Sequence, residues 1–300
     1  MLRKRILRKI YLTTMIVFTL FIISSFTINK SINNIKVEYQ TKISKVYLMD
    51  DNDYLLSVPV SVKESVIDSI PIVINNLKQG YNHISGLKGI IPNGTKINSL
   101  KLQDGLLEID FNKELLNVNS DLEEKIVESV LFSLLEFKEV EKVKITIDSK
   151  PLSNYLKSNI LVGEILTKDF GINKEYSINS TIDIKRVVLY FYEERDNNKY
   201  YVPITKYINS KDDKVKIIID NLKNNYLAKP NLMSYINNKI NIEKYQKEND
   251  IVTISFSSLL DFDDANVIEE AIYTLSKSII DSSVASKVIF MQNDHIISIK

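Results

Sequence analysis

The sequence predicts an α+β protein: two similar tandem domains, each with a small mixed or antiparallel sheet and two helices on one face, preceded by one N-terminal transmembrane helix. Three observations lead to this prediction. The hydrophobic pattern of residues 45–150 recurs over 186–300, and each copy contains short alternating runs around two helical stripes. An uncharged stretch, 10–28, lies ahead of both copies. A constant offset of 145 residues relates most of the second copy to the first, which indicates a diverged tandem duplication.

The N-terminal segment is typical of a signal-anchor. Tyr11–Ile28 carries no charge, and its eighteen residues would span about 27 Å as a helix, close to the thickness of a bilayer core. The basic tail 1–9 predicts a cytoplasmic N-terminus and places the remaining domains outside the membrane. A cleaved signal peptide is the alternative. Residues 29–44 are then a spacer.

Each copy opens with a predicted hairpin and a helix. In the first copy, alternating apolar residues near 46–48 and 56–60 flank the polar turn Asp50–Asp53, read as a solvated turn and not as a calcium loop. Pro71 suits the first turn of the following helix. Its apolar stripe recurs 145 residues later, so it is expected to face the core: Ile70, Val73, Ile74 and Leu77 correspond to Val215, Ile218, Ile219 and Leu222.

The second half of each copy predicts strand, strand, helix, strand. Strands near 96–102 and 106–111 meet at Asp104-Gly105, a strong hairpin signal. The spacing from Ser120 to Glu123 predicts a capping box at the start of the second helix. Val143, Ile145 and Ile147 alternate as a final strand. The order is β-β-α-β-β-α-β, and 151–185 is expected to be a linker with some local packing.

Composition limits the chemistry. The chain is 44% apolar and 26% charged, as in folded globular proteins, and its net charge of +1 gives no general attraction to nucleic acid. It has no cysteine, which excludes thiol catalysis, disulfides and cysteine lipidation. The two histidines occupy unrelated positions and suggest no triad or zinc site. No catalytic, cofactor or metal residue is predicted.

Both copies resemble the GerM domain of sporulation and spore-germination proteins. The segments that carry the resemblance are KVYLMDDNDYLLSVPV, NLKQG, GLKGIIPNGTKINSLKLQDGLLEIDF and VEKVKITID. The resemblance implies an envelope protein of a spore-forming bacterium, and a fold similar to modules that build extracytoplasmic rings. Family members are often lipoproteins, which this cysteine-free chain cannot be. It implies no catalytic residue.

The second copy departs from the first in its loops. All five loop glycines of the first copy are replaced, whereas the apolar stripes persist: Gly80, Gly86, Gly89, Gly94 and Gly105 correspond to Asn225, Asn231, Ser234, Lys239 and Asp250. Asn and Asp tolerate left-handed backbone angles better than Lys or Ser. If one copy retains an ancestral contact surface, residues 45–150 are therefore the expected one.

Two groups of residues are candidate partner-binding positions. The first is the loop of the first copy, and the second is the tyrosine-rich first hairpin of the second copy, where tyrosine also suits a strand for structural reasons. The candidates are His83, Gly86, Gly89, Pro92, Asn93 and Gly94, and Tyr190, Tyr192, Tyr200 and Tyr201. The leading hypothesis is a non-enzymatic membrane protein that assembles with envelope proteins or with itself. The alternatives are a sensor that binds a peptidoglycan fragment or germinant-like molecule, and, less favoured, a wall hydrolase.

Overall fold

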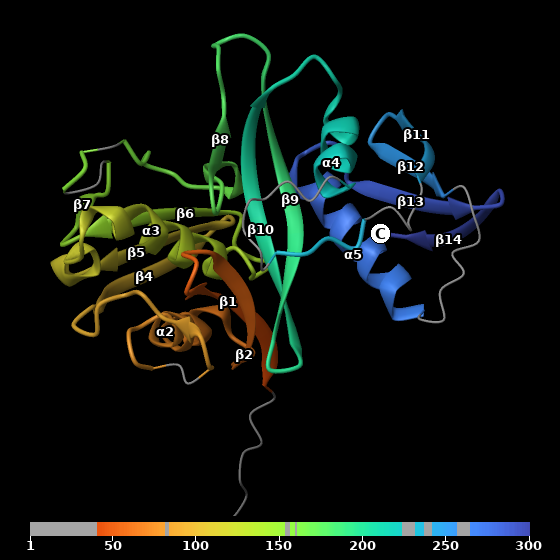
Figure 1. The fold of residues 1–300 in the computed structure, drawn as a ribbon. Helices are drawn as coiled ribbons and strands as arrows, with labels where there is room; N and C mark the ends of the chain where they lie inside the picture. The colour runs from red at the N-terminus through yellow and green to blue at the C-terminus, as the bar shows by residue number, and fades with distance from the viewer. Residues whose placement is uncertain are drawn as a thin grey trace, which may run out of the picture. The chain divides into compact units, whose positions relative to one another are not determined.

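The computed structural model describes residues 41–81, 84–153, 157–159, 161–223, 232–236, 242–256 and 265–300 (Figure 1). Both repeats belong to one compact unit, Thr41–Lys300. The predicted tail, transmembrane helix and most of the spacer lie outside the described residues. Within the described ranges, no helix has the length and apolar character needed to cross a bilayer.

The first repeat contains every element that the sequence predicts, and two short strands in addition. Its elements in chain order are β1 (Lys42–Asp50), β2 (Leu55–Val62), α2 (Val66–Asn76), β3 (Leu87–Lys88), β4 (Ile97–Gln103), β5 (Leu106–Phe111), the 3₁₀ turn η1 (Lys113–Leu116), α3 (Ser120–Leu134), β6 (Lys142–Ile147) and β7 (Lys150–Pro151). Segment 151–185 adds η2 (Lys168–Phe170) and β8 (Glu175–Ser177).

The second repeat has the same order of main elements, without β3 and η1 among its described residues. They are β9 (Ile184–Arg195), β10 (Asn198–Asn209), α4 (Lys214–Lys223), β11 (Ile242–Glu248), β12 (Ile251–Phe256), α5 (Ala265–Asp281), β13 (Lys287–Gln292) and β14 (His295–Ile299). From β11 to β13, each strand and the start of the helix lie 145 residues after their counterparts in the first repeat. The expected mixed α+β content of tandem repeats is confirmed.

Each repeat has two hydrogen-bonded sheets, where one was predicted. The first repeat has the orders β2-β1-β3 and β4-β5-β6-β7, and the second has β8-β10-β9 and β11-β12-β13-β14. β5 and β6 run parallel across α3, and β12 and β13 run parallel across α5. β1 ends in five consecutive buried residues, so this hairpin is covered on both faces and does not extend a one-sided sheet. Hydrophobic periodicity predicts the helices and strands, but which strands pair with one another depends on tertiary contacts.

The predicted capping box at α3 is wrong. Asn119 occupies the cap position without a side-chain hydrogen bond, and Ser120 is already helical. Glu123 is fully buried, and its carboxylate accepts hydrogen bonds from the backbone N–H groups of Lys157 (2.9 Å) and Ser158 (3.1 Å). A tertiary contact with segment 151–185 has therefore replaced the local one.

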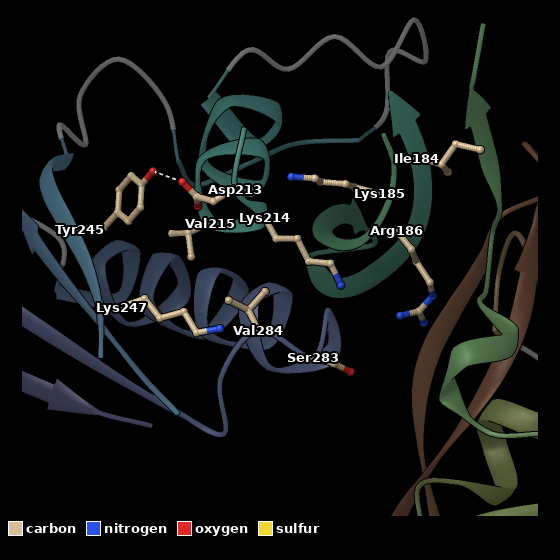
Figure 2. Close-up of a pocket in the computed structure, with 10 residues that line it drawn as sticks. All are labelled: Ile184, Lys185, Arg186, Asp213, Lys214, Val215, Tyr245, Lys247, Ser283 and Val284. Atoms are coloured by element: carbon tan, nitrogen blue, oxygen red, sulfur yellow. Dashed lines mark hydrogen bonds between the residues drawn. The ribbon is translucent and has the colours of Figure 1, made fainter. Parts of the chain in front are cut away.

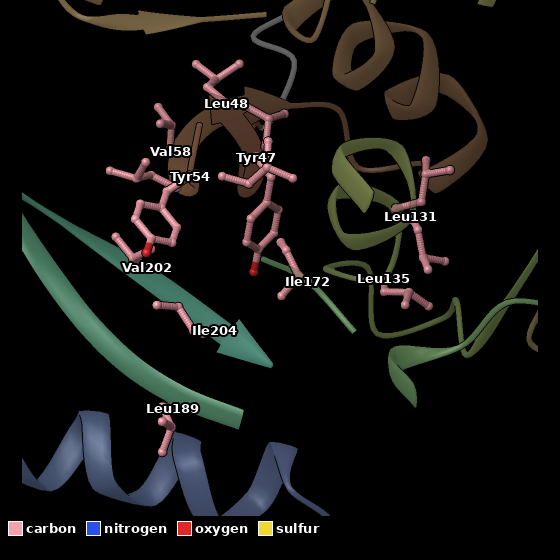
Figure 3. Packing of buried hydrophobic residues seen from close by; sticks show 14 of the residues in the cluster. Tyr47, Leu48, Tyr54, Val58, Leu131, Leu135, Ile172, Leu189, Val202 and Ile204 are labelled. Atoms are coloured by element: carbon pink, nitrogen blue, oxygen red, sulfur yellow. The ribbon is translucent and has the colours of Figure 1, made fainter. Parts of the chain in front are cut away.

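The two repeats share one hydrophobic core. Figure 3 shows Leu48 and Val58 of the first repeat on one side, Val202 and Ile204 of β10 on the other, and Ile172 from the intervening segment nearby. All five are buried, and β2 and β10 lie close together. The segment expected to be a linker therefore contributes to the core that joins the repeats.

Candidate functional site between the two repeats

Asn173 bridges the first hairpins of the two repeats. Its side-chain amide accepts a hydrogen bond from the N–H of Leu55 (2.9 Å) and donates to the carbonyls of Leu55 (2.9 Å) and Pro203 (2.9 Å). Its own N–H donates to Glu128 of α3 (3.0 Å). Asn173 is 2% exposed and has a φ of 49°, a left-handed angle that Asn tolerates. A single side chain thus satisfies backbone groups from both repeats.

Two tyrosine–carboxylate pairs occupy corresponding places in the two repeats, since the N–H groups of Tyr47 and Tyr190 donate to Ser133 and Ser278, which are 145 residues apart. The Tyr47 hydroxyl donates to Glu136 (2.9 Å), and the Tyr190 hydroxyl donates to Asp281 (2.6 Å), where Asp281 is the residue 145 positions after Glu136. Burial raises the pKa of both phenols well above the usual value, and each is raised further by the carboxylates of both pairs. The two buried tyrosines and their carboxylates, of which Glu136 is exposed, therefore form one electrostatically linked centre, which we call the tyrosine junction (Tyr47, Glu136, Tyr190 and Asp281).

Gly86, a candidate in the first-repeat loop, contacts the second repeat. Its carbonyl accepts a hydrogen bond from Arg195 Nη1 (2.9 Å), and a Cβ added at Gly86 would lie 1.9 Å from that nitrogen. Arg195 also faces the carboxylates of Asp50 (3.6 Å) and Asp51 (3.7 Å). Asp50 is fully buried, so the acidic turn is a hairpin turn as predicted but is not fully solvated. This part of the loop is occupied by an intramolecular contact.

Arg195 reaches that contact because it lies at the end of β9, next to the tip of the β9–β10 hairpin. Each of its strands has 12 residues, against 9 and 8 in β1 and β2. Asp196 and Asn197 at the tip have φ values of 47° and 61°, as a type I′ turn requires. The turn signal was present in the sequence, but nothing in it showed which partner Arg195 meets.

The remaining loop candidates have structural explanations or lie outside the described residues. His83 lies outside the described residues. A Cβ at Gly89 would lie 2.3 Å from the carbonyl oxygen of Lys78, so glycine allows the chain to pass the end of α2. Pro92 accepts a hydrogen bond from the N–H of Thr95 (3.0 Å), and Asn93 and Gly94 are exposed in this turn.

The four candidate tyrosines do not form one surface. Tyr190 and Tyr200 are buried, at 8% and 9% exposure. Tyr192 is half-buried and stacks on Tyr235, with ring centroids 4.0 Å apart. Tyr201 lies 4.6 Å from the Tyr273 ring, and its hydroxyl donates to Glu270. The hairpin therefore divides them between the core and two separate aromatic contacts.

Tyr201 lines a cavity of about 520 Å³ in the second repeat. Its other walls come from α5 and the C-terminal strand, and include Glu270, Tyr273, Ile297 and Lys300. Burial raises the pKa of Glu270, although Lys199 opposes the shift. The cavity offers aromatic rings, a carboxyl group and a cation to a ligand. Within the described ranges, no group of three or more His, Cys, Asp or Glu residues could hold a metal ion.

Comparisons with known proteins agree with the architecture. A family model described as "Germane: Sporulation and spore germination" matches residues 45–153 and 188–297. Spore germination protein GerM of Bacillus subtilis (strain 168) is 30% identical over 190 residues, which are 61% of this chain and 51% of that protein. The matched region thus spans about half the length of that relative.

A solved structure of the tandem GerMN domains of the sporulation protein GerM from Bacillus subtilis has the same fold. It superimposes with a TM-score of 0.73 at 22% identity, covering 85% of this chain and 92% of that one. The resemblance predicted for both repeats is therefore confirmed. The chain belongs to the Germane family of sporulation and spore germination, and it carries two copies of the family's domain.

Proposed function

We propose that this chain is a membrane-anchored, non-enzymatic protein of sporulation or germination that acts outside the cytoplasm through protein–protein assembly. Its family and its GerM relative support the process. The basic N-terminus and the uncharged stretch after it support the anchor. The partners are other envelope proteins or further copies of this chain.

The observation that carries the assembly role is the edge strand β14. It forms one end of the sheet β11-β12-β13-β14, and no strand in the described part of the chain pairs with its outer edge. Ile296, Ile297 and Ile299 are 58%, 40% and 51% exposed. An exposed apolar edge strand is a template for pairing with a strand of another protein.

The corresponding edge of the first repeat is interrupted. β7 has two residues, one of them Pro151, which has no N–H to donate. Further along β6, Leu166 exchanges backbone hydrogen bonds with Val143 (2.9 and 2.8 Å) as an isolated bridge. In the second repeat, Lys300 takes the place of Leu166 opposite Val288, at the end of a continuous strand. The open edge is therefore a property of the second repeat.

Ile299→Pro tests the edge. Lys300 exchanges both backbone hydrogen bonds with Val288, at 2.8 and 2.9 Å, so the neighbouring Ile299 directs its N–H and C=O away from β13. Proline removes the outward donor and leaves the β13–β14 bonds in place. We expect crosslinking and pulldown from sporulating cells to lose the partner captured by the wild type, with the melting temperature almost unchanged.

Ile299→Thr is the matched control, because it removes the same apolar side chain but keeps the N–H group. It should retain more of the captured partner than the proline variant. Equal capture by the wild type and Ile299→Pro would contradict strand pairing at β14.

A second candidate function is a sensor of a peptidoglycan fragment, favoured by the cavity at Tyr201 and Tyr273. Muropeptides that fill this cavity would change tyrosine fluorescence and raise the melting temperature of the full chain. The assembly role requires neither response.

A further inference from the structure

The second repeat has a cavity of about 730 Å³ where the first hairpin, the start of α4 and β11 converge above the end of α5 (Figure 2). Four cations and one carboxylate contribute to its walls: Lys185, Arg186, Lys214, Lys247 and Asp213. Figure 2 shows the charged ends of Arg186, Lys214 and Lys247 around the space above Ser283 and Val284. In a chain of net charge +1, this is a concentrated positive site.

The carboxylate of Asp213 is already engaged. It accepts hydrogen bonds from the Tyr245 hydroxyl (2.6 Å) and the N–H of Lys216 (3.0 Å) at the start of α4. Burial acts to raise its pKa, but these hydrogen bonds hold the pKa below its usual value. Asp213 is therefore an anion that serves the helix and the tyrosine, and it gives little compensation to the four cations.

The cations themselves are satisfied mainly by neutral groups. Lys214 donates to the carbonyl of Ser282 (2.9 Å), Lys185 to that of Asp212, and Arg186 to that of Lys168 (2.7 Å). Carbonyl groups accept hydrogen bonds but carry no net charge. Among the described residues, the ammonium group of Lys247 has neither a hydrogen-bond partner nor an ion-pair partner, although its backbone lies in the β11–β12 ladder. The positive charge of the cavity is thus largely uncompensated.

Arg186 retains an unused donor. Its Nε atom is buried and has no hydrogen-bond partner, and the one carboxylate near its guanidinium, that of Asp169, is 3.5 Å away and 80% exposed. A buried donor without a partner is unfavourable, and a ligand oxygen could supply the missing partner. Burial, followed by the charge of Arg186, lowers the pKa of Lys214. An anion in the cavity would relieve this repulsion.

The first repeat has no equivalent site. At the offset of 145 residues, Ser69 and Leu102 occupy the positions of Lys214 and Lys247. These two cations are therefore specific to the second repeat. The four cations of the cavity come from three separate elements, so a single charged helix face does not explain them.

We propose that this cavity binds a small molecule bearing two or more oxyanion groups, phosphate or carboxylate. The planar guanidinium of Arg186 can donate two parallel hydrogen bonds to either group, and the lysines supply point charges around it. The cavity is larger than one inorganic anion needs, which fits a ligand with several charged groups. The site does not depend on the proposed assembly through β14.

Calorimetric titration of the full 300-residue chain tests the site. Inorganic pyrophosphate represents a phosphate source, and citrate represents a carboxylate source. We expect at least one of them to bind at low ionic strength and to raise the melting temperature, with both effects decreasing as salt is added. Preference for one probe identifies the oxyanion.

Lys247→Gln is the decisive variant, because Lys247 is exposed and supports no other contact. It should bind the preferred probe roughly fivefold more weakly. Lys214→Gln should lose about tenfold, but the loss of its bond to Ser282 could also destabilise the fold. Lys244→Gln is the matched control, because Lys244 is an exposed lysine of β11 that does not line the cavity. Absence of binding by both probes, or equal weakening by Lys247→Gln and Lys244→Gln, would overturn the proposal.

Discussion

At the scale of single residues, the duplication has preserved an interaction while changing its chemical form. The acid is Glu136 in one repeat and Asp281 in the other, yet each accepts a hydrogen bond from a buried tyrosine hydroxyl. Asp281 also faces Lys168 (3.5 Å) and Lys277 (3.6 Å). Burial acts to raise its pKa, but the two ammonium groups and the Tyr190 hydroxyl hold it below the usual value.

This arrangement predicts a pH-dependent contribution to stability. A carboxylate with a lowered pKa stabilises the folded state above its unfolded value of about 3.9, and the contribution is lost as pH falls through the folded pKa. Asp281→Asn should therefore lower the free energy of unfolding by about 1–3 kcal/mol at pH 7. The difference from the wild type should shrink between pH 4 and pH 2, as measured by urea denaturation.

Asp294→Asn is the control, because Asp294 lies in an exposed turn with a φ of 60°, which asparagine also adopts. Glu128 responds in the opposite direction, since burial raises its pKa despite Lys125 and Lys174. Each variant is therefore compared with the wild type at the same pH, so that the contribution of Glu128 cancels. A constant difference between Asp281→Asn and the wild type from pH 7 to pH 2 would contradict the assignment.

At the scale of elements, the connection from α2 to β4 shows that loop glycines can have different causes. Gly80 has a φ of 72° with open space around the missing Cβ, whereas Gly89 is confined by the carbonyls of Leu77 and Lys78. One glycine is needed for its backbone angle and the other for a close approach of two chain segments.

We therefore expect different costs for two chemically identical substitutions. Gly80→Ala should lower the free energy of unfolding by about 1 kcal/mol, the cost of a left-handed alanine. Gly89→Ala should cost about 3 kcal/mol, because backbone atoms must move. Thermal or urea denaturation measures both. A Gly89→Ala variant as stable as Gly80→Ala would show that the end of α2 adapts easily.

The elements also show what the sequence could predict. The stripe of Ile70, Val73 and Ile74 is buried as expected, because periodicity reports directly on the face of a helix. The β11–β12 turn forms without glycine: Asn249 keeps the left-handed φ of its counterpart Asp104 (52° and 51°), whereas Asp250, in place of Gly105, does not have a positive φ. β14 was missed because its isoleucines follow no strict alternation. The contacts of Arg195 with Gly86 and of Asn173 with Leu55 have no local signature, since each joins residues more than 100 positions apart in the sequence.

At the scale of the whole molecule, the two repeats are not independent modules. Buried side chains from both repeats and from segment 151–185 form one cluster. Neither first hairpin is fully covered without the other, because β2 and β10 lie close together and Asn173 bonds to both. Loss of one repeat would expose apolar surface of the other.

We expect the wild-type chain to unfold in one cooperative transition. Calorimetric and van't Hoff enthalpies should agree, as they do for a single cooperative unit. Asn173→Gly tests the coupling, because glycine keeps the left-handed angle but removes the three side-chain bonds to Leu55 and Pro203. It should lower stability by about 2–4 kcal/mol, whereas Asn93→Gly in an exposed turn should have little effect. Two separated transitions in the wild type would contradict the shared core.

The bridge at Asn173 has a consequence for how such chains can evolve. Tandem domains joined by a passive tether can be shuffled, lost or multiplied, because each unit carries its own stability. Here the intervening segment is fitted to both neighbours, and a change in its length would displace Ile172 and Asn173 from the two hairpins. Recombination that exchanged one copy would have to carry the segment with it. The two repeats and the segment between them are therefore expected to be inherited and exchanged together, and not as single repeats.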